Sequence, residues 1–134
     1  MIILTNIELM EHWIKSSDDN LKTMETLYKA KDYAWSLFIG HLVVEKLFKG
    51  LYAKLNVEQP HSPKIHNLVQ LADKCKLEIS KEIREELSII THFNMNARYE
   101  DYKDTFKEKA TKEYADIHIQ KIKELVVWLK AKLI

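Results

Sequence analysis

The segment from residue 32 to 55 constrains the fold more than any other part of the chain. Its apolar residues would face most sides of a helix, and the charged or titratable residues that interrupt its middle are His41, Glu45, Lys46 and Lys49. A helix that is apolar nearly all round lies at the centre of a helical protein. A membrane span would need ~20 mostly uncharged residues. The segment therefore predicts the central helix of a soluble domain.

Four other segments carry apolar residues at steps of three and four, which predicts an amphipathic helix in each. These segments are residues 6–28, 63–75, 81–95 and 111–133, with loops at 56–62 and 96–106. Asp32, Ser62 before Pro63, and Ser80 stand at expected N-caps, where a side-chain oxygen accepts a backbone N–H. Ile117 belongs to the buried stripe expected for the last helix.

The composition supports the same architecture. The chain has 134 residues, of which 46% are apolar and only 2 are glycine and 2 proline. Strand-rich folds need many Gly and Pro residues for tight turns, so their scarcity predicts few, long elements. We expect one domain over residues 1–134, an all-α up-down bundle of four long helices and one short helix. Gly40 and Gly50, inside the central helix, indicate close approach of a neighbour.

Several classes of function are excluded or disfavoured. Lys plus Arg number 21 against 20 Asp plus Glu, and this balance disfavours non-specific binding to duplex nucleic acid. The one cysteine, Cys75, excludes a disulfide framework and a cysteine zinc cluster. Glu58 and His61 have di-iron spacing but fall in a loop, so we expect no metal and no cofactor. The N-terminus lacks the pattern of a signal peptide, and we expect a cytoplasmic protein.

Two groups of polar residues are candidates for function. His41, Glu45 and Lys49 share one face of the central helix, because they are four residues apart. They form either a solvated stripe or the polar wall of a groove. Arg98 is one of only two arginines.

Arg98 stands in the sequence Arg98-Tyr99-Glu100-Asp101-Tyr102. Its guanidinium can clamp a phosphate, and the tyrosines can stack on a base. The alternative is a structural loop held by an Arg–carboxylate pair. We place Arg98 at the mouth of a groove, facing the Glu45–Lys49 side of the central helix.

These motifs, in this order, resemble the HEPN domain (higher eukaryotes and prokaryotes nucleotide-binding). The matching segments cover nearly the whole chain: Asp32-Tyr33, Glu45-Lys46-x-x-Lys49, His66-Asn67-Leu68 and Ala97-Arg98-Tyr99. The resemblance implies an all-α bundle that often forms homodimers. It also implies a minimal nucleotidyltransferase as partner, in some cases within a toxin–antitoxin pair.

The chain departs from the ribonucleases of this superfamily, which carry an Arg-x(4–6)-His motif. No histidine follows Arg98 in range, and His92 lies one position too far from Arg84. The resemblance therefore implies the non-nuclease branch, with Arg98, Tyr99, Glu45 and Lys49 as nucleotide-binding residues. Asp101 and Tyr102 join them from the same loop, and we predict no catalytic residue.

Three hypotheses follow. The first is an accessory protein that binds a nucleotide or RNA and acts with a nucleotidyltransferase. The second is a metal-independent ribonuclease toxin with a rearranged site, with His92 as the base. The third is a purely structural interaction module. A homodimer is expected in addition, because Trp35, Phe38 and Phe48 leave apolar surface on the central helix that one bundle would not cover.

Overall fold

The computed structural model describes residues 4–98 and 105–134, and for residues 95–98 it describes the backbone alone. These residues form α1 (Asn6–Lys29), α2 (Tyr33–Leu55), α3 (Leu68–Lys74), α4 (Lys81–Arg98), α5 (Thr105–Lys109) and α6 (Lys112–Leu133). The all-α bundle with four long helices is confirmed. The described residues hold two short helices, α3 and α5, where the sequence predicted one.

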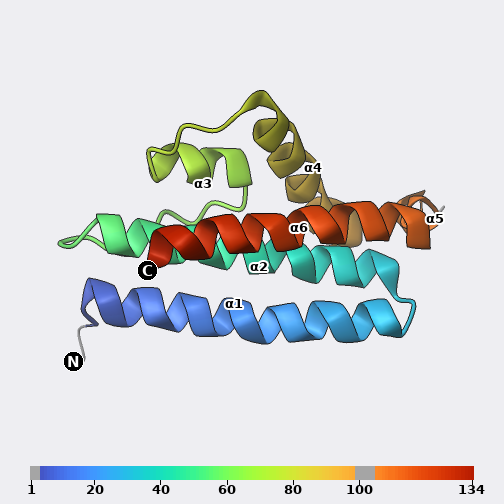
Figure 1. Cartoon of the computed structure of the whole chain (residues 1–134), viewed down its shortest axis with the longest axis horizontal. Coiled ribbons are helices and arrows are strands. Elements are labelled where there is room, and N and C mark those ends of the chain that lie inside the picture. Colours follow the sequence, from blue (N-terminus) through green and yellow to red (C-terminus); the bar gives the residue numbers. More distant parts are fainter. Residues whose placement is uncertain (1–3, 99–104) are drawn as a thin grey trace.

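The central helix is α2, as expected, and it packs against each of the other five helices (Figure 1). Helix α1 runs antiparallel to α2 along its full length. Helix α6 runs in the same direction as α2, so their C-terminal ends meet, and Lys54 Nζ donates to the carbonyl of Lys132 at 2.7 Å. Helices α3 and α4 lie on the side of α2 away from α1.

The start of the third helix was predicted wrongly. Helix α3 begins at Leu68 instead of Pro63, because the Asn67 side chain accepts a hydrogen bond from the Gln70 N–H at 3.0 Å and caps it there. Ser80 caps α4 as predicted, since its hydroxyl accepts from the Ile83 N–H at 3.1 Å. Asp32 occupies the N-cap position of α2, but its side chain makes no capping hydrogen bond.

The loop predicted over residues 96–106 is wrong at both ends. Helix α4 continues to Arg98, and α5 begins at Thr105. Residues 96–98 extend α4, and two of them, Ala97 and Arg98, are good helix formers. Phe106 is buried, and its ring centroid lies 5.7 Å from that of Phe93, which packs α5 against α4.

The core contains two further corrections. Phe48 has no exposed surface, so it does not contribute to the uncovered apolar surface expected on the central helix. Ile117, expected to be buried, is 55% exposed, whereas its neighbour His118 faces inward. No helix in the described ranges is long and apolar enough to cross a membrane.

Candidate nucleotide-binding site

Glu45, near the middle of α2, is only 3% exposed and holds three other side chains together. Its Oε1 accepts a hydrogen bond from His66 Nδ1 at 2.9 Å, and its Oε2 lies 3.2 Å from Lys49 Nζ. His41 Nε2 lies 3.7 Å from Oε1. A buried carboxylate is tolerated when it is paired and hydrogen-bonded, and these neighbours meet that need. We call these four residues the Glu45 cluster.

His41 belongs to the core. It is 0% exposed, and burial lowers the pKa of its imidazole. In the neutral ring Nε2–H donates to the backbone carbonyl of His66 at 2.9 Å, while Nδ1 is buried with no hydrogen-bond partner. The interpretation of His41 and Glu45 as a solvated stripe is therefore wrong. His41 instead fixes the backbone of the loop that carries His66.

Lys49 is largely covered as well. Its side chain is 14% exposed, and Nζ lies 5.2 Å from the ring centroid of Trp13 on α1. Lys49 therefore makes a favourable cation–π contact with Trp13 in addition to its ion pair with Glu45. Lys46, the adjacent lysine of the motif, points to α1, where Nζ donates to Asn20 Oδ1 at 2.5 Å. Burial lowers the pKa of Lys46.

His66 is the accessible member of the Glu45 cluster. Its side chain is 55% exposed, although both its ring and its carbonyl are held by α2. Because the carboxylate orients Nδ1–H, the neutral ring keeps Nε2 as an acceptor. Reasoning from the sequence noted His66 in the family motif but did not connect it with Glu45. The residue that could have located His66 is Asn67. As the N-cap of α3, Asn67 leaves His66 in the loop just before that helix.

The other four predicted site residues belong to the segment from Arg98 to Tyr102. The Arg98 side chain, Tyr99, Asp101 and Tyr102 lie outside the described residues. The end of α4 is described, and Thr91 on that helix accepts from the Leu68 N–H at 3.0 Å. Helix α4 is therefore anchored close to the loop that holds His66.

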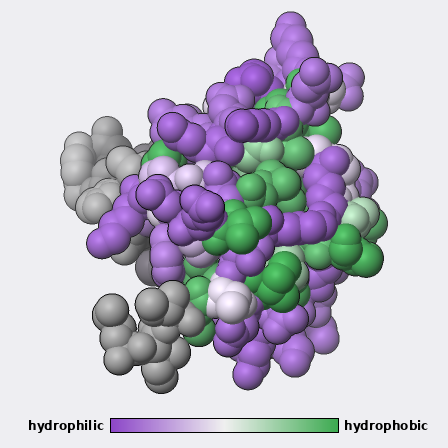
Figure 2. All heavy atoms as spheres, turned by 90° about the vertical axis from the view of Figure 1, so that its left-hand side faces the viewer, coloured by the Kyte–Doolittle hydropathy of each residue, from purple (hydrophilic) through white to green (hydrophobic). Residues whose placement is uncertain are grey.

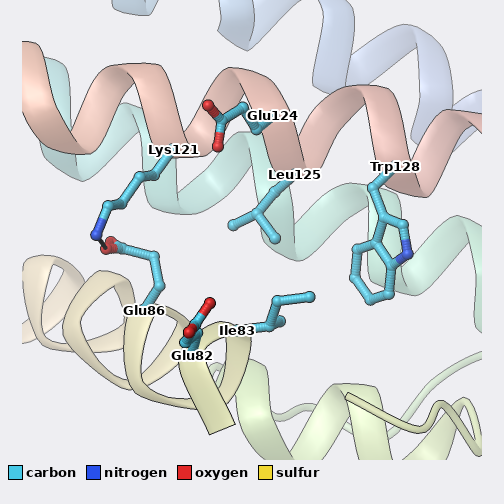
Figure 3. A pocket seen from close by; sticks show the side chains of 7 residues that line it. All are labelled: Glu82, Ile83, Glu86, Lys121, Glu124, Leu125 and Trp128. Atoms are coloured by element: carbon cyan, nitrogen blue, oxygen red, sulfur yellow. Dashed lines mark ion pairs between the residues drawn. The ribbon is translucent and has the colours of Figure 1, made fainter. Parts of the chain in front are cut away.

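A second buried carboxylate was missed by the sequence analysis. Glu86 on α4 is 6% exposed, and its Oε2 accepts from His118 Nδ1 of α6 at 2.8 Å. Lys121 Nζ lies 3.3 Å from Oε1, at the edge of a cavity of about 380 Å³ between α4 and α6 (Figure 3). The helical spacing contained the signal, because Glu86 is three residues after Ile83 and four before Ile90 on the same face.

The remaining titratable groups show no built site for a metal. No group of three His, Cys, Asp or Glu side chains within the described ranges could hold a metal ion. Burial raises the pKa of the Cys75 thiol to about 12, and Sγ contacts the carbonyl of Phe48 at 3.5 Å. A thiol that remains protonated is a poor nucleophile.

Comparison with known proteins agrees with this architecture. The family model of the HEPN domain matches residues 10–132, and the chain therefore belongs to the HEPN domain family. TT1696 from Thermus thermophilus superposes with a TM-score of 0.76 at 16% identity, covering 92% of this chain and 98% of that one. ST0689, an archaeal HEPN homologue, gives a TM-score of 0.75 at 20% identity, covering 93% and 98%. A search of curated proteins finds no match.

Proposed function

We propose that this HEPN-domain protein binds a nucleotide or RNA and acts as the accessory partner of a minimal nucleotidyltransferase in a toxin–antitoxin-like module. The observation that supports the proposal is the Glu45 cluster. It holds Lys49 and the accessible ring of His66 on one edge of the central helix. The binding residues that we propose are Arg98, Tyr99, Asp101 and Tyr102 together with Lys49, with Glu45 as the residue that positions Lys49 and His66.

Isothermal titration with ATP, GTP and a short single-stranded RNA tests the binding role. We expect binding tighter than about millimolar for at least one of these ligands, because a nucleotide offers both a charged group and a stacking face. Arg98→Ala should weaken that binding and leave the free energy of unfolding within ~1 kcal/mol of the wild-type value. No binding of any ligand would refute the proposal for the isolated protein.

A second candidate function, metal-independent cleavage of RNA, is favoured by one observation. The Glu45–His66 hydrogen bond orients the imidazole as a carboxylate does in a general base. His92, the base suggested by the sequence, instead directs Nδ1 at the Ser88 carbonyl of its own helix, 2.8 Å away. Incubation of total RNA with the wild type and with His66→Ala discriminates between the two functions: only cleavage that disappears in the variant supports a nuclease.

A homodimer is part of the proposal. At the end of the bundle where α1 begins and α2 ends, apolar side chains gather among hydrophilic ones (Figure 2). Ile7, Leu55 and Val57 are 46%, 53% and 66% exposed there. Monomers rarely leave a contiguous apolar patch uncovered. Light scattering should therefore give twice the chain mass of 15.9 kDa, and Leu55→Glu with Val57→Glu should yield monomers. A wild type that is monomeric at micromolar concentration would contradict this expectation.

A further inference from the structure

A pocket of about 430 Å³ lies where the turn between α1 and α2 meets α5. It shares no residue with the Glu45 cluster. Its lining comes from two segments far apart in the sequence: Lys31, Asp32, Tyr33, Ala34 and Trp35 on one side and Lys107 and Ala110 on the other.

Two lysines give the pocket its positive charge. Neither Lys31 nor Lys107 has an ion-pair partner among the described residues, whereas Lys112 and Lys130 pair with carboxylates at 2.8 and 2.5 Å. An ammonium without a carboxylate partner remains available to an anion. The lining holds one acidic residue, Asp32, whose side chain makes no capping hydrogen bond. The charged groups that line the pocket are therefore two lysines and one aspartate, and within residues 4–94 and 105–134 none of the three has an ion-pair partner.

The backbone of Lys31 is fixed. Its φ is 64°, the left-handed conformation in which α-helices commonly end. Its N–H donates to the Tyr28 carbonyl at 3.0 Å, and the Asp32 N–H donates to the Leu27 carbonyl at 2.9 Å. This is the Schellman pattern. Lys31 is consequently held at the rim of the pocket by the same bonds that terminate α1.

The aromatic residues give the pocket a stacking surface. Trp35 is 40% exposed, and its ring stands edge-on to that of Phe38 at 5.4 Å, with an interplanar angle of 85°. Tyr33 packs edge-on against Tyr28 at 5.7 Å. Aromatic side chains such as indole stack on nucleobases of any sequence. An exposed indole beside two ammonium groups that lack an ion-pair partner in the described part of the chain matches a ligand that carries a flat ring and a phosphate.

We infer that this pocket binds one nucleotide unit, with the base stacked on Trp35, the phosphate held by Lys31 and Lys107, and Asp32 accepting from a sugar hydroxyl. The inference rests on the proposed function and adds a second contact region for the same kind of ligand, separate from the binding residues proposed above. A free nucleotide and a nucleotide within single-stranded RNA share this chemistry. Trp35 lies ten residues before Glu45 on the same helix, which corresponds to ~15 Å, so a strand of RNA could contact both regions.

The decisive experiment compares two lysines with the same backbone. Lys76 also has a positive φ, 57°, in a Schellman turn at the end of α3, and it does not line this pocket. Lys31→Gly and Lys76→Gly should therefore have the same effect on the backbone and on the free energy of unfolding. We expect Lys31→Gly and Lys107→Gln each to weaken the binding of ATP or of a short oligoadenylate RNA about three- to tenfold. Lys76→Gly should bind within about twofold of the wild type.

Tryptophan fluorescence supplies an independent readout. Ligand binding should quench the fluorescence of Trp35. The Trp35→Phe variant should therefore lose most of the ligand-dependent fluorescence change, whereas Trp128→Phe should retain it. Binding of ATP with quenching identifies the free nucleotide as the source of the ligand, and binding of the RNA alone identifies RNA. If the wild type binds and the two pocket lysine variants match Lys76→Gly, this location is wrong while the proposed function stands. If the wild type binds none of the probes, the proposed function fails as well.

Discussion

Glu45 Oε1 lies 2.9 Å from His66 Nδ1, so a carboxylate of the central helix holds an imidazole from the loop before α3. His41, one turn before Glu45, holds the carbonyl of the same histidine at 2.9 Å. Two side chains of one helix thus fix both the ring and the backbone of His66. The loop is positioned by polar contacts to the core in addition to its own turn structure.

The Glu45 cluster should contribute strongly to stability. Glu45→Ala leaves Lys49 and His66 without their common partner, and breaking a buried charged pair costs about 3–5 kcal/mol. Glu45→Gln keeps a hydrogen-bond acceptor in a side chain of the same shape, so the loss of stability should be smaller, about 1–2 kcal/mol. Urea denaturation measures both changes. Glu11→Ala, at an exposed position of α1, is the control and should stay within about 0.5 kcal/mol. A Glu45→Ala variant as stable as this control would show that the cluster is not a structural centre.

The buried His41 should make the protein less stable in mild acid. Burial lowers the pKa of its imidazole in the folded state below the unfolded value of about 6.5. The unfolded state therefore binds more protons, and the free energy of unfolding falls as pH decreases below about 6.5. The contribution of neutral His41 is fully present above that pH. The groups facing this ring are Glu45, His66 and Lys49.

His41→Gln tests this dependence, because its amide can still donate to the His66 carbonyl but does not titrate. Melting temperatures at about pH 7.5 and 5.5 should differ less in the variant than in the wild type. An unchanged difference would show that the acid sensitivity comes from a group other than His41.

The sequence predicted the bundle well, because hydrophobic periodicity over long segments decides which face of a helix is buried. It did not predict α5, because a helix of five residues is too short to show a hydrophobic period. It also misplaced the start of α3. By itself, Ser62-Pro63 would favour a helix start. The helix begins after Asn67 instead, which leaves His66 in the preceding loop, within hydrogen-bond distance of Glu45.

The site was predicted only in part, for a physical reason. The spacing of His41, Glu45 and Lys49 correctly placed them on one face, and their ion pairs join consecutive turns. Spacing does not reveal whether such a face is solvated or covered. Here the covering group is a loop residue, His66, whose position depends on tertiary packing. The contribution of Arg98, Tyr99, Asp101 and Tyr102 stays a prediction.

Two helix ends should gain stability from glycine. Lys31 and Lys76 adopt φ values of 64° and 57°, and the left-handed conformation costs an L-residue roughly 1–2 kcal/mol. Glycine has no such penalty but loses more entropy on folding. We therefore expect Lys31→Gly and Lys76→Gly each to stabilise the protein by about 0.5–1 kcal/mol in thermal melts. Lys31→Ala and Lys76→Ala, which keep the penalty, should show no gain, and a gain equal to that of glycine would disprove the explanation.

The two glycines of α2 should respond oppositely to alanine. A Cβ at Gly50 would meet Trp13 Cβ at 3.4 Å, an ordinary contact, so Gly50→Ala should gain about 0.5–1 kcal/mol from helix propensity. A Cβ at Gly40 would lie 2.6 Å from Ile122 Cδ1 and 3.1 Å from Met24 Sδ. Overpacking of this kind typically costs about 1–3 kcal/mol, so Gly40→Ala should be neutral or destabilising.

Ile122→Val provides the matched test, because it removes the Cδ1 methyl group that the new Cβ would meet. Alone, this substitution should destabilise by about 0.5–1.5 kcal/mol. In the Gly40→Ala background it should cost much less or restore stability, so the double-mutant cycle should show a favourable coupling of at least about 0.5 kcal/mol. Gly50→Ala with Ile122→Val, whose sites are not in contact, should be additive. Additive free energies in both cycles would mean that the close approach of α6 to Gly40 does not limit side-chain size there.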